Sequence, residues 1–278
     1  MNYVSYIVYG LNDGYFLGAK FSIISLFANT KETLEVVVLT DRADYFAELP
    51  VRTLELSEAQ KKEWSLNGQY HFRIKNRGLA YIIDSLQLNS IDRVIAIDTD
   101  TYFSTSITPV FDRLNKEWST IFRNEGAIRE KRRFSVYVEA LEGRSLITPK
   151  GKSYQMSENA EMWGTLLWGF EVSNRSVLDD ADDIMLCLLN HVDAHTIEPF
   201  SLTEAIKSDH RLFESKDFVE HYSTSGKKRH ALAVLEKFFE SHRGASFAEL
   251  KAHSKQLKLS RNMIQLLRSR YERHIQKL

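Results

Sequence analysis

The first hundred residues of the chain alternate between strand-like and helix-like segments, and this alternation constrains the fold more than any other feature. Short, apolar, β-rich runs predict strands at residues 3–9, 34–39 and 93–97. Amphipathic segments between them, at residues 15–28 and 71–88, predict helices. Strands that alternate with helices build a mainly parallel sheet with helices on its faces. The sequence therefore predicts an α/β fold of the Rossmann type.

The length and composition of the chain allow one large domain with an appendage, or two modest domains. Of its 278 residues, 43% are hydrophobic, which is enough to fill a sizeable core. The single cysteine, Cys187, excludes an internal disulfide and is typical of the reducing cytoplasm. The first residues lack the pattern of a signal peptide, and no apolar stretch approaches the ~20 residues that span a bilayer. We therefore expect a soluble, cytoplasmic protein.

The net charge of zero hides a division between an acidic body and a basic tail. Residues 227–278 contain 13 Lys and Arg but only 4 Asp and Glu, a net charge of +9 that leaves −9 on the rest of the chain. Any surface that attracts polyanions should therefore lie at the C-terminal end.

The tail also has a helical pattern, with helices expected at residues 231–242 and after Ser246 and Ser260. The last helix should turn an apolar stripe inward and leave its arginines in water. The stripe consists of Ile264, Leu267, Tyr271, Ile275 and Leu278, and the arginines are Arg261, Arg268 and Arg270. The sequence thus predicts a main domain at residues 1–229 and a basic helical extension at residues 230–278.

Candidate ligand-binding residues follow the predicted strands, because ligands of such sheets collect beyond the carboxyl ends of the strands. Gly10, Asp41 and Asp98 stand at three of these ends. The strand at residues 93–97 runs into an Asp-x-Asp motif formed by Asp98 and Asp100, and in an extended chain alternate residues share a face. Two carboxylates on one side suit a hard divalent ion such as Mn²⁺ or Mg²⁺. Such an ion can neutralise a diphosphate leaving group as a Lewis acid.

The apolar strand, the Asp-x-Asp motif and residues 101–103 together resemble the metal-binding stretch of GT-A nucleotide-sugar glycosyltransferases. The similarity is greatest to glycogenin-like proteins and to bacterial galactosyl- and glucosyltransferases. Residues 6–10, 18–26 and 37–41 look like the first strand, first helix and second strand of these enzymes. As a pattern, the resemblance covers residues 2–229. It implies a GT-A-like catalytic domain with a mainly parallel sheet, followed by a helical C-terminal extension outside the resemblance.

The resemblance also implies a function and a set of site residues. Such enzymes move a sugar from a nucleotide-sugar donor, most often a UDP-sugar, to an acceptor that here can be a glycan, a lipid-linked molecule or a protein. Residues 221–228 resemble their His-x-x-Gly-x-Lys region, so Asp98, Asp100 and His221 are expected to bind Mn²⁺ or Mg²⁺, with Asp100 essential to catalysis. The residues expected at the donor are Tyr9, Gly10, Asp41, Lys75 or Arg77, Asp98, Thr99, and Lys227 or Lys228.

Three features depart from the pattern of these enzymes. Two extra residues separate His221 from Gly226, so either of the following lysines can meet the diphosphate. Residues 167–170 keep the glycine of an Asn-x-Gly stretch but lack its asparagine. The acidic-Gln pair of the relatives appears as Glu198-Pro199, and Glu198 is expected to face the sugar as a second catalytic residue.

The regular alternation fails at residues 124–164, a polar segment rich in arginine. Two interpretations of this segment stay open: a region that covers the substrate, or a poorly ordered surface excursion. A strand is expected again at residues 165–172, followed by a helix at residues 174–190.

A phosphatase of the haloacid dehalogenase type is the nearest alternative function. In that case Asp98 would be the nucleophile, Asp100 the acid/base and Mg²⁺ the cofactor, and residues 179–183 would supply a later acidic pair. At least two predicted strands precede the motif here, whereas that motif normally ends the first strand. The later aspartates also begin a predicted helix instead of following a strand. Both observations favour the transferase.

Binding without catalysis is the third alternative. The basic segment at residues 246–267 loosely resembles a helix-turn-helix, although we expect no nucleic-acid binding. Basic amphipathic helices also attract anionic lipids, so peripheral membrane contact through the tail is a further alternative. A transferase that has lost its activity would still bind the nucleotide-sugar.

Overall fold

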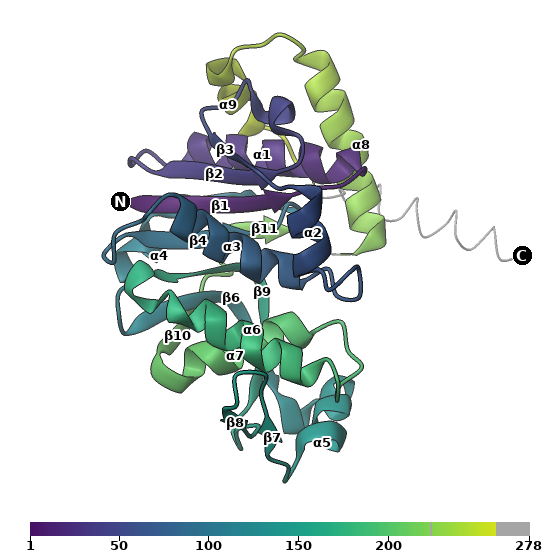
Figure 1. Cartoon of the computed structure of the whole chain (residues 1–278). Helices are drawn as coiled ribbons and strands as arrows, with labels where there is room; N and C mark the ends of the chain where they lie inside the picture. Colours follow the sequence, from purple (N-terminus) through teal and green to yellow (C-terminus); the bar gives the residue numbers. More distant parts are fainter. Residues whose placement is uncertain (223, 260–278) are drawn as a thin grey trace, which may run out of the picture.

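The computed structural model of the protein describes residues 1–222 and 224–259 and has a seven-stranded sheet at its centre (Figure 1). The spatial order of its strands is β10-β6-β9-β4-β1-β2-β3. The strands are β1 (Asn2–Val8), β2 (Glu35–Thr40), β3 (Arg52–Glu55), β4 (Arg93–Ile97), β6 (Trp118–Ala127), β9 (Glu161–Glu171) and β10 (Arg211–Glu214).

The sheet is mainly parallel, as the alternating sequence predicts. The neighbouring pairs β1–β2, β1–β4, β2–β3 and β6–β10 are parallel, and only β9 runs antiparallel to its two neighbours, β4 and β6. The first three predicted strands appear as β1, β2 and β4 within one residue of their expected ends. The α/β fold class is therefore confirmed.

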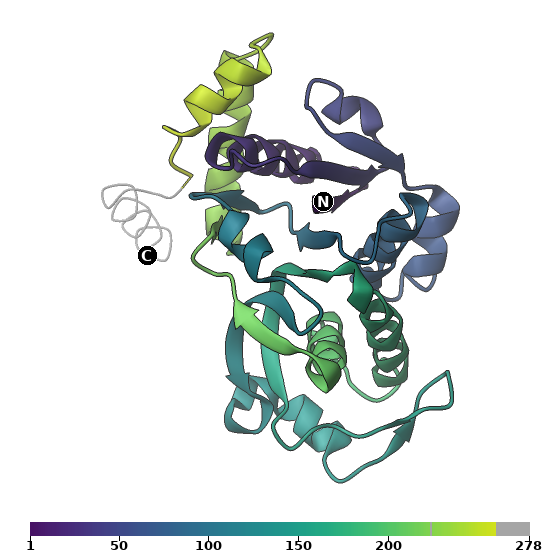
Figure 2. The ribbon, with the colours of Figure 1, turned by 90° about the vertical axis from the view of Figure 1, so that its left-hand side faces the viewer.

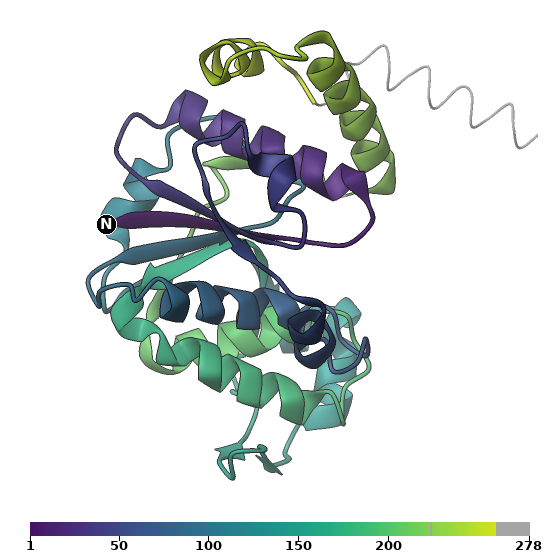
Figure 3. The ribbon, with the colours of Figure 1, turned by 45° about the horizontal axis from the view of Figure 1, so that its top comes forward.

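Helices cover both faces of the sheet (Figure 3). On one face α1 (Asp13–Asn29) packs with α8 (Ser225–Ser241) and α9 (Phe247–Ser254), and its residues Phe16, Ile23 and Ile24 are fully buried. On the other face α3 (Arg73–Ser85), α6 (Ser176–Leu188) and α7 (Ile197–Asp209) bury a second cluster around Trp168 and Phe170 of β9.

The segment at residues 124–164 is more regular than its sequence pattern indicates. It continues β6 and then forms a short helix, α5 (Ser135–Leu141), and a hairpin of β7 (Leu146–Ile147) and β8 (Ser153–Tyr154). These elements lie beyond α6 and α7 at the lower end of the molecule in Figure 2. The side chains of Tyr137 and Leu141 in α5 are buried in a cluster with Phe200 of α7. The interpretation as a poorly ordered excursion is therefore wrong, because side chains of the segment are buried in an apolar cluster that it shares with α6 and α7.

The remaining elements are short. They are α2 (Glu58–Trp64), α4 (Thr108–Arg113), α5 (Ser135–Leu141), β5 (Thr101–Phe103), β7 (Leu146–Ile147), β8 (Ser153–Tyr154), β11 (Val219–His221) and the 3₁₀ turns η1 (Ala43–Phe46), η2 (Ile128–Glu130), η3 (Arg132–Phe134) and η4 (Val172–Asn174). α2 starts with the capping box that the sequence predicts, in which Ser57 and Gln60 cap each other's backbone N–H groups.

The helical extension is joined to the main domain by a continuous helix. α8 runs through residue 230, where the sequence places a boundary, and its residues Ala231, Leu235 and Phe238 belong to the same core cluster as α1. α9 begins with the expected capping box of Ser246 and Glu249. The expected stripe of Ile264, Leu267, Tyr271, Ile275 and Leu278, with Arg261, Arg268 and Arg270, lies outside the described residues. No helix in the described part of the chain is long and apolar enough to cross a membrane.

Candidate functional site

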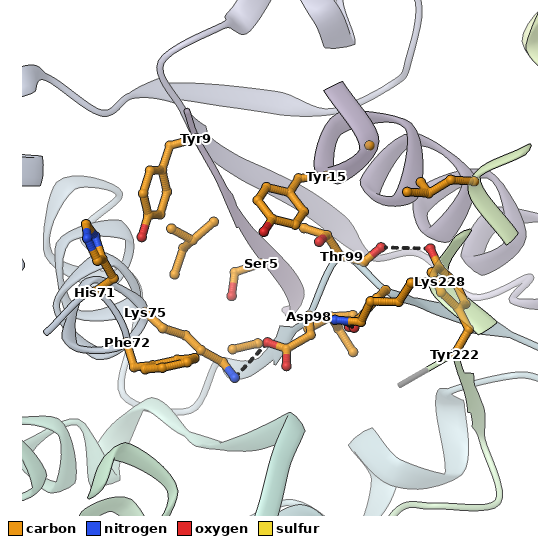
Figure 4. Close-up of a pocket in the computed structure, with 16 residues that line it drawn as sticks. Ser5, Tyr9, Tyr15, His71, Phe72, Lys75, Asp98, Thr99, Tyr222 and Lys228 are labelled. Atoms are coloured by element: carbon orange, nitrogen blue, oxygen red, sulfur yellow. Dashed lines mark hydrogen bonds and ion pairs between the residues drawn. The ribbon is translucent and has the colours of Figure 1, made fainter. Parts of the chain in front are cut away.

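A cavity of about 280 Å³ opens at the carboxyl ends of β1 and β4, the two central parallel strands (Figure 4). Its walls come from β1, the turn after β4, the start of α1, the start of α3, the residue after β11 and the first half of α8. They are formed by Ser5, Ile7, Tyr9, Gly14, Tyr15, His71, Phe72, Lys75, Ala96, Ile97, Asp98, Thr99, Asp100, Tyr222, Lys228 and Leu232.

The Asp-x-Asp motif forms a turn at the floor of this cavity. The Thr101 hydroxyl donates to the Asp98 carbonyl oxygen (2.7 Å), and the Tyr222 hydroxyl donates to the Thr99 carbonyl oxygen (3.3 Å). α1 approaches this turn so closely that a Cβ atom on Gly18 would lie 2.4 Å from the Thr99 carbonyl oxygen. Glycine at this position therefore allows α1 and the turn to pack together.

The Asp98 carboxylate faces the cation of Lys75, the residue on α3 that points into the cavity (Figure 4). The Lys75 Nζ atom lies 2.7 Å from Asp98 Oδ1 and also donates to the Thr165 carbonyl oxygen (2.6 Å). Burial alone would lower the pKa of the Lys75 ammonium, but the nearby charges of Asp98 and Glu198 outweigh burial and raise it. Lys75 is therefore a fixed positive charge at the floor of the cavity.

The Asp100 carboxylate faces different partners from those of Asp98. Its Oδ2 atom lies 2.7 Å from Lys228 Nζ and 3.3 Å from His221 Nε2. The antiparallel pairing of β11 with β5 places His221 opposite Thr101, which brings the imidazole beside the turn. Burial would raise the pKa of Asp100, but the hydrogen bonds from His221 and Lys228 outweigh burial and lower it to about 2. Asp100 is therefore firmly ionised.

The expected common direction of the two carboxylates is wrong. That expectation assumed an extended chain through the motif, whereas Thr99 and Asp100 form a turn between β4 and β5. The turn directs Asp98 toward α3 and Asp100 toward α8 and β11. The two carboxylates at the cavity floor thus have separate cationic partners.

Asp100 and His221 fit a divalent ion as a pair. Two ligands at right angles around an octahedral ion, each about 2.1 Å from it, lie about 3 Å apart, close to the 3.3 Å that separates the two side chains. Carboxylate and imidazole also match the preferences of Mn²⁺. Within residues 1–222 and 224–259, however, three His, Cys, Asp or Glu side chains are nowhere grouped to hold a metal. Asp98 is the member that stands apart, because its carboxylate faces Lys75.

Glu198 lies in the first turn of α7, behind Lys75, and its side chain is 3% exposed. Its Oε2 atom accepts a hydrogen bond from the Thr165 hydroxyl (3.0 Å), and Oε1 has no hydrogen-bond partner among the described residues. Burial raises the pKa of Glu198; Lys75 opposes this effect and the charge of Asp98 adds to it. The backbone N–H of Glu198 donates to the Tyr70 hydroxyl (2.7 Å). Glu198 is therefore a buried acid held next to the cavity floor.

A fourth acid, Asp41, follows β2 and contacts Gly10 after β1, outside the set of residues that line the cavity. Gly10 has a left-handed φ of 93° and donates its N–H to Asp41 Oδ2 (3.0 Å). Asp41 Oδ2 also lies 2.6 Å from Lys61 Nζ, and the buried Oδ1 has no partner among the described residues. Tyr9 lines the cavity, and burial raises its pKa to about 12.

The structure separates the residues that the sequence left as alternatives. Lys75 lines the cavity, whereas Arg77 points toward Asp182 on α6, with 3.9 Å between their charged atoms. Lys228 lines the cavity, and Lys227 is exposed outside its walls. Thr99 lines the cavity as expected.

Several cavity residues were not assigned a role from the sequence. Phe72 and Tyr15 are each 50% exposed and form aromatic walls, and Tyr222 packs beneath the turn. Leu232 on α8 closes one side of the cavity, and Lys61, outside the cavity walls, pairs with Asp41. The only available signal was proximity in the sequence: Tyr222 follows His221, and Phe72 precedes Lys75 by one helical turn.

The similarity of this chain to a solved structure concerns the fold alone, because the sequence identity is 13%. No protein-family model and no curated protein matches the chain. The fold is similar to the galactosyltransferase LgtC in complex with donor and acceptor sugar analogues, with 13% identity, a TM-score of 0.55, and coverage of 91% of this chain and 96% of that one. Apo mouse xyloside xylosyltransferase 1 matches with 12% identity, a TM-score of 0.47, and coverage of 77% and 85%. The chain therefore has the GT-A fold of a known glycosyltransferase.

Proposed function

We propose that the protein is a metal-dependent glycosyltransferase that moves a sugar from a nucleotide-sugar donor, with a UDP-sugar favoured, to an acceptor molecule. The observation that carries the proposal is the pairing of Asp98 and Asp100 with Lys75 and Lys228 in a cavity at the carboxyl ends of β1 and β4. In open α/β sheets this edge is where ligands bind. Two ammonium groups at the floor of a cavity suit a diphosphate.

The cavity walls suit the two ends of such a donor. Tyr9, Tyr15 and Phe72 offer aromatic faces to a planar base, and Gly10 with Asp41 would offer polar groups beside Tyr9, outside the residues that line the cavity. Lys75 and Lys228 would then face the diphosphate, because they flank the turn at the cavity floor.

Asp100 and His221 would hold Mn²⁺ or Mg²⁺, and Asp98 would complete the set of ligands after turning from Lys75. The ion would supply Lewis-acid neutralisation of the leaving diphosphate. Glu198 would face the sugar, because its carboxylate lies behind Lys75 and has one oxygen free of partners among the described residues. The Lys75 and Asp100 side chains are 18% and 19% exposed, and this partial burial would strengthen their electrostatic contacts.

The side chains on α6 disfavour the alternative phosphatase function. A phosphatase of that type needs a second acidic pair beside the nucleophile. The aspartates of α6 instead contact other partners: Asp182 pairs with Arg73, Asp179 with Arg175, Asp180 with Lys152, and Asp183 accepts from the Lys150 N–H.

A thermal-shift panel of UDP-, GDP- and CDP-sugars, with and without Mn²⁺, tests the proposal. A ligand at ~100 times its Kd stabilises the folded state by about 2.7 kcal/mol. We expect this stabilisation from UDP and UDP-sugars with Mn²⁺ and not in EDTA. Equal stabilisation in EDTA would contradict metal dependence. Trapping of a phosphoaspartate at Asp98 with a fluoride analogue of phosphate would favour the phosphatase.

A further inference from the structure

One oxygen atom of Asp100 is shared by two side chains that have different roles in the proposed reaction. Lys228 Nζ and His221 Nε2 both lie within hydrogen-bonding distance of Oδ2, at 2.7 and 3.3 Å. A divalent ion that binds between Asp100 and His221 would need this carboxylate too. The ammonium and the ion therefore compete for the same ligand, and they also repel each other.

Helix α8 holds the backbone of Lys228 at this position. It lies in the first turn of α8, where Thr224 caps the helix and accepts the Lys228 backbone N–H at its carbonyl oxygen (2.8 Å). The same helix is anchored in the main core by Ala231, Leu235 and Phe238. The backbone of Lys228 is therefore fixed, and only its side chain has to move in order to leave Asp100.

Lys75 and Lys228 differ in how strongly the protein holds their ammonium groups. The Lys75 side chain is 18% exposed and has a second partner in the Thr165 carbonyl oxygen. The Lys228 side chain is 45% exposed, and Asp100 is its one ion-pair partner within residues 1–222 and 224–259. Lys228 is thus the cation that can be exchanged.

We infer that Lys228 is an exchangeable counter-cation, which neutralises Asp100 while the metal site is empty and moves to the diphosphate of the donor when the ion binds. This inference rests on the proposed function. This exchange implies that the ion and the nucleotide bind cooperatively. The ion releases the Lys228 ammonium from Asp100 so that the diphosphate can bind it, and the diphosphate holds the ammonium away from Asp100, which favours the ion. Mn²⁺ alone should therefore bind weakly, and Mn²⁺ with UDP should bind tightly.

The test is calorimetric titration of the full chain with Mn²⁺ alone and with UDP in saturating Mn²⁺. In Lys228→Met we expect the Kd for Mn²⁺ alone to be about tenfold lower than in the wild type, the equivalent of about 1.4 kcal/mol. The Kd for UDP should be about tenfold higher, because the diphosphate has lost its cation. The two changes have opposite signs, which a loss of folding cannot produce.

Lys227→Met is the matched control, since it removes the same charge from the same helical turn but lies outside the cavity walls. Both of its Kd values should stay within about twofold of the wild type if only long-range charge has changed. Thermal unfolding in EDTA checks that each variant is folded, and Lys228→Gln repeats the test with a polar side chain.

The outcomes separate the inference from the proposed function. If Lys228→Met binds Mn²⁺ no more tightly than Lys227→Met does, the inference is wrong, but the proposed metal site is not contradicted. If neither the wild type nor Lys228→Met binds Mn²⁺, alone or with UDP, both the proposed metal site and the inference are contradicted.

Discussion

The two halves of the sheet place acids in and beside the same cavity but neutralise their charge differently. In the half built from β1 to β4 and the turn that follows, each acid has a lysine partner: Asp41 with Lys61, Asp98 with Lys75, and Asp100 with Lys228, at 2.6 to 2.7 Å. In the half that contains β9 and α7, Glu198 accepts from a single hydroxyl, and one of its oxygens has no partner among the described residues.

The difference indicates that the two halves do different work. Paired charges keep a polar cavity stable in the absence of an anionic ligand, because a lysine neutralises each acid. A buried acid with no ion pair of its own costs stability, even with the charge of Lys75 nearby, and such groups are concentrated at functional sites. The first half thus suits binding of the donor, and Glu198 suits the chemistry at the sugar.

Removal of Asp100 should have the largest effect on activity. In Asp100→Ala we expect transfer to fall by at least about 10³-fold, because a group that stabilises charge in the transition state is lost. Initial rates with a UDP-sugar panel and Mn²⁺ measure the effect. Asp112→Ala, an exposed position on α4, is the control and should transfer at the wild-type rate. Transfer by Asp100→Ala at more than a tenth of the wild-type rate would show that the paired half is not the reacting centre.

Glu198 should act on turnover and leave nucleotide binding unchanged. In Glu198→Gln we expect kcat to fall about 10²-fold, the lower range for losing one catalytic group, with the Kd for UDP unchanged. Glu204→Gln is the matched control, since Glu204 is a half-buried acid on the same helix that contacts Tyr154, away from the cavity. A parallel loss of UDP affinity in Glu198→Gln would remove the distinction between the two halves.

The two kinds of acid should also respond oppositely to pH. The folded pKa of Asp100 is about 2 against an ordinary 3.8, so its stabilisation is complete above pH 4 and is lost as the pH falls toward 2. A shift of this size corresponds to about 2 kcal/mol. The pKa of Glu198 is raised by burial, so its contribution is present below its ordinary 4.5 and is lost as the pH rises.

At pH 7 we therefore expect Asp100→Asn to lower the free energy of unfolding and Glu198→Gln to raise it. Urea unfolding at pH 7 and at pH 3 measures both, and the effect of Asp100→Asn should shrink at pH 3. Changes of the same sign in the two variants at pH 7 would mean that their burial and pairing do not differ as described.

The sequence predicts the first half of the fold well because its signals are local. The strand predicted at residues 93–97 is β4 with the same bounds. The strands predicted at residues 3–9 and 34–39 match β1 and β2 within one residue. The second half depends on long-range pairing: Thr120 of β6 faces Gly169 of β9, and two irregularities interrupt the register between these strands. A bulge shifts the alternation of buried residues, so β6 has no clean periodic pattern.

The sequence indicates the acids of the candidate site, and for their lysine partners it leaves pairs of alternatives. Asp98 and Asp100 follow an apolar strand, which is a signal that the sequence carries. The choice between Lys75 and Arg77 depends on the rotation of α3, because residues two apart on a helix point about 200° apart. The choice between Lys227 and Lys228 depends on where α8 begins, and the sequence pattern placed that start near residue 231, six residues late.

The smallest expected effect concerns the glycine that allows the paired half to assemble. In Gly18→Ala the new Cβ atom would meet the Thr99 carbonyl oxygen at 2.4 Å, so α1 or the turn must shift. We expect a loss of about 1–2 kcal/mol in the free energy of unfolding, in the lower range for overpacking. Gly226→Ala, where no atom of the described residues beyond its own helical turn lies within 4 Å of the new Cβ, should be neutral or gain a few tenths of a kcal/mol from its helical position. Because the turn carries Asp98 and Asp100, Gly18→Ala should also weaken Mn²⁺-dependent UDP binding, and an unchanged affinity in a destabilised variant would mean that the two acid–lysine pairs do not depend on the position of α1.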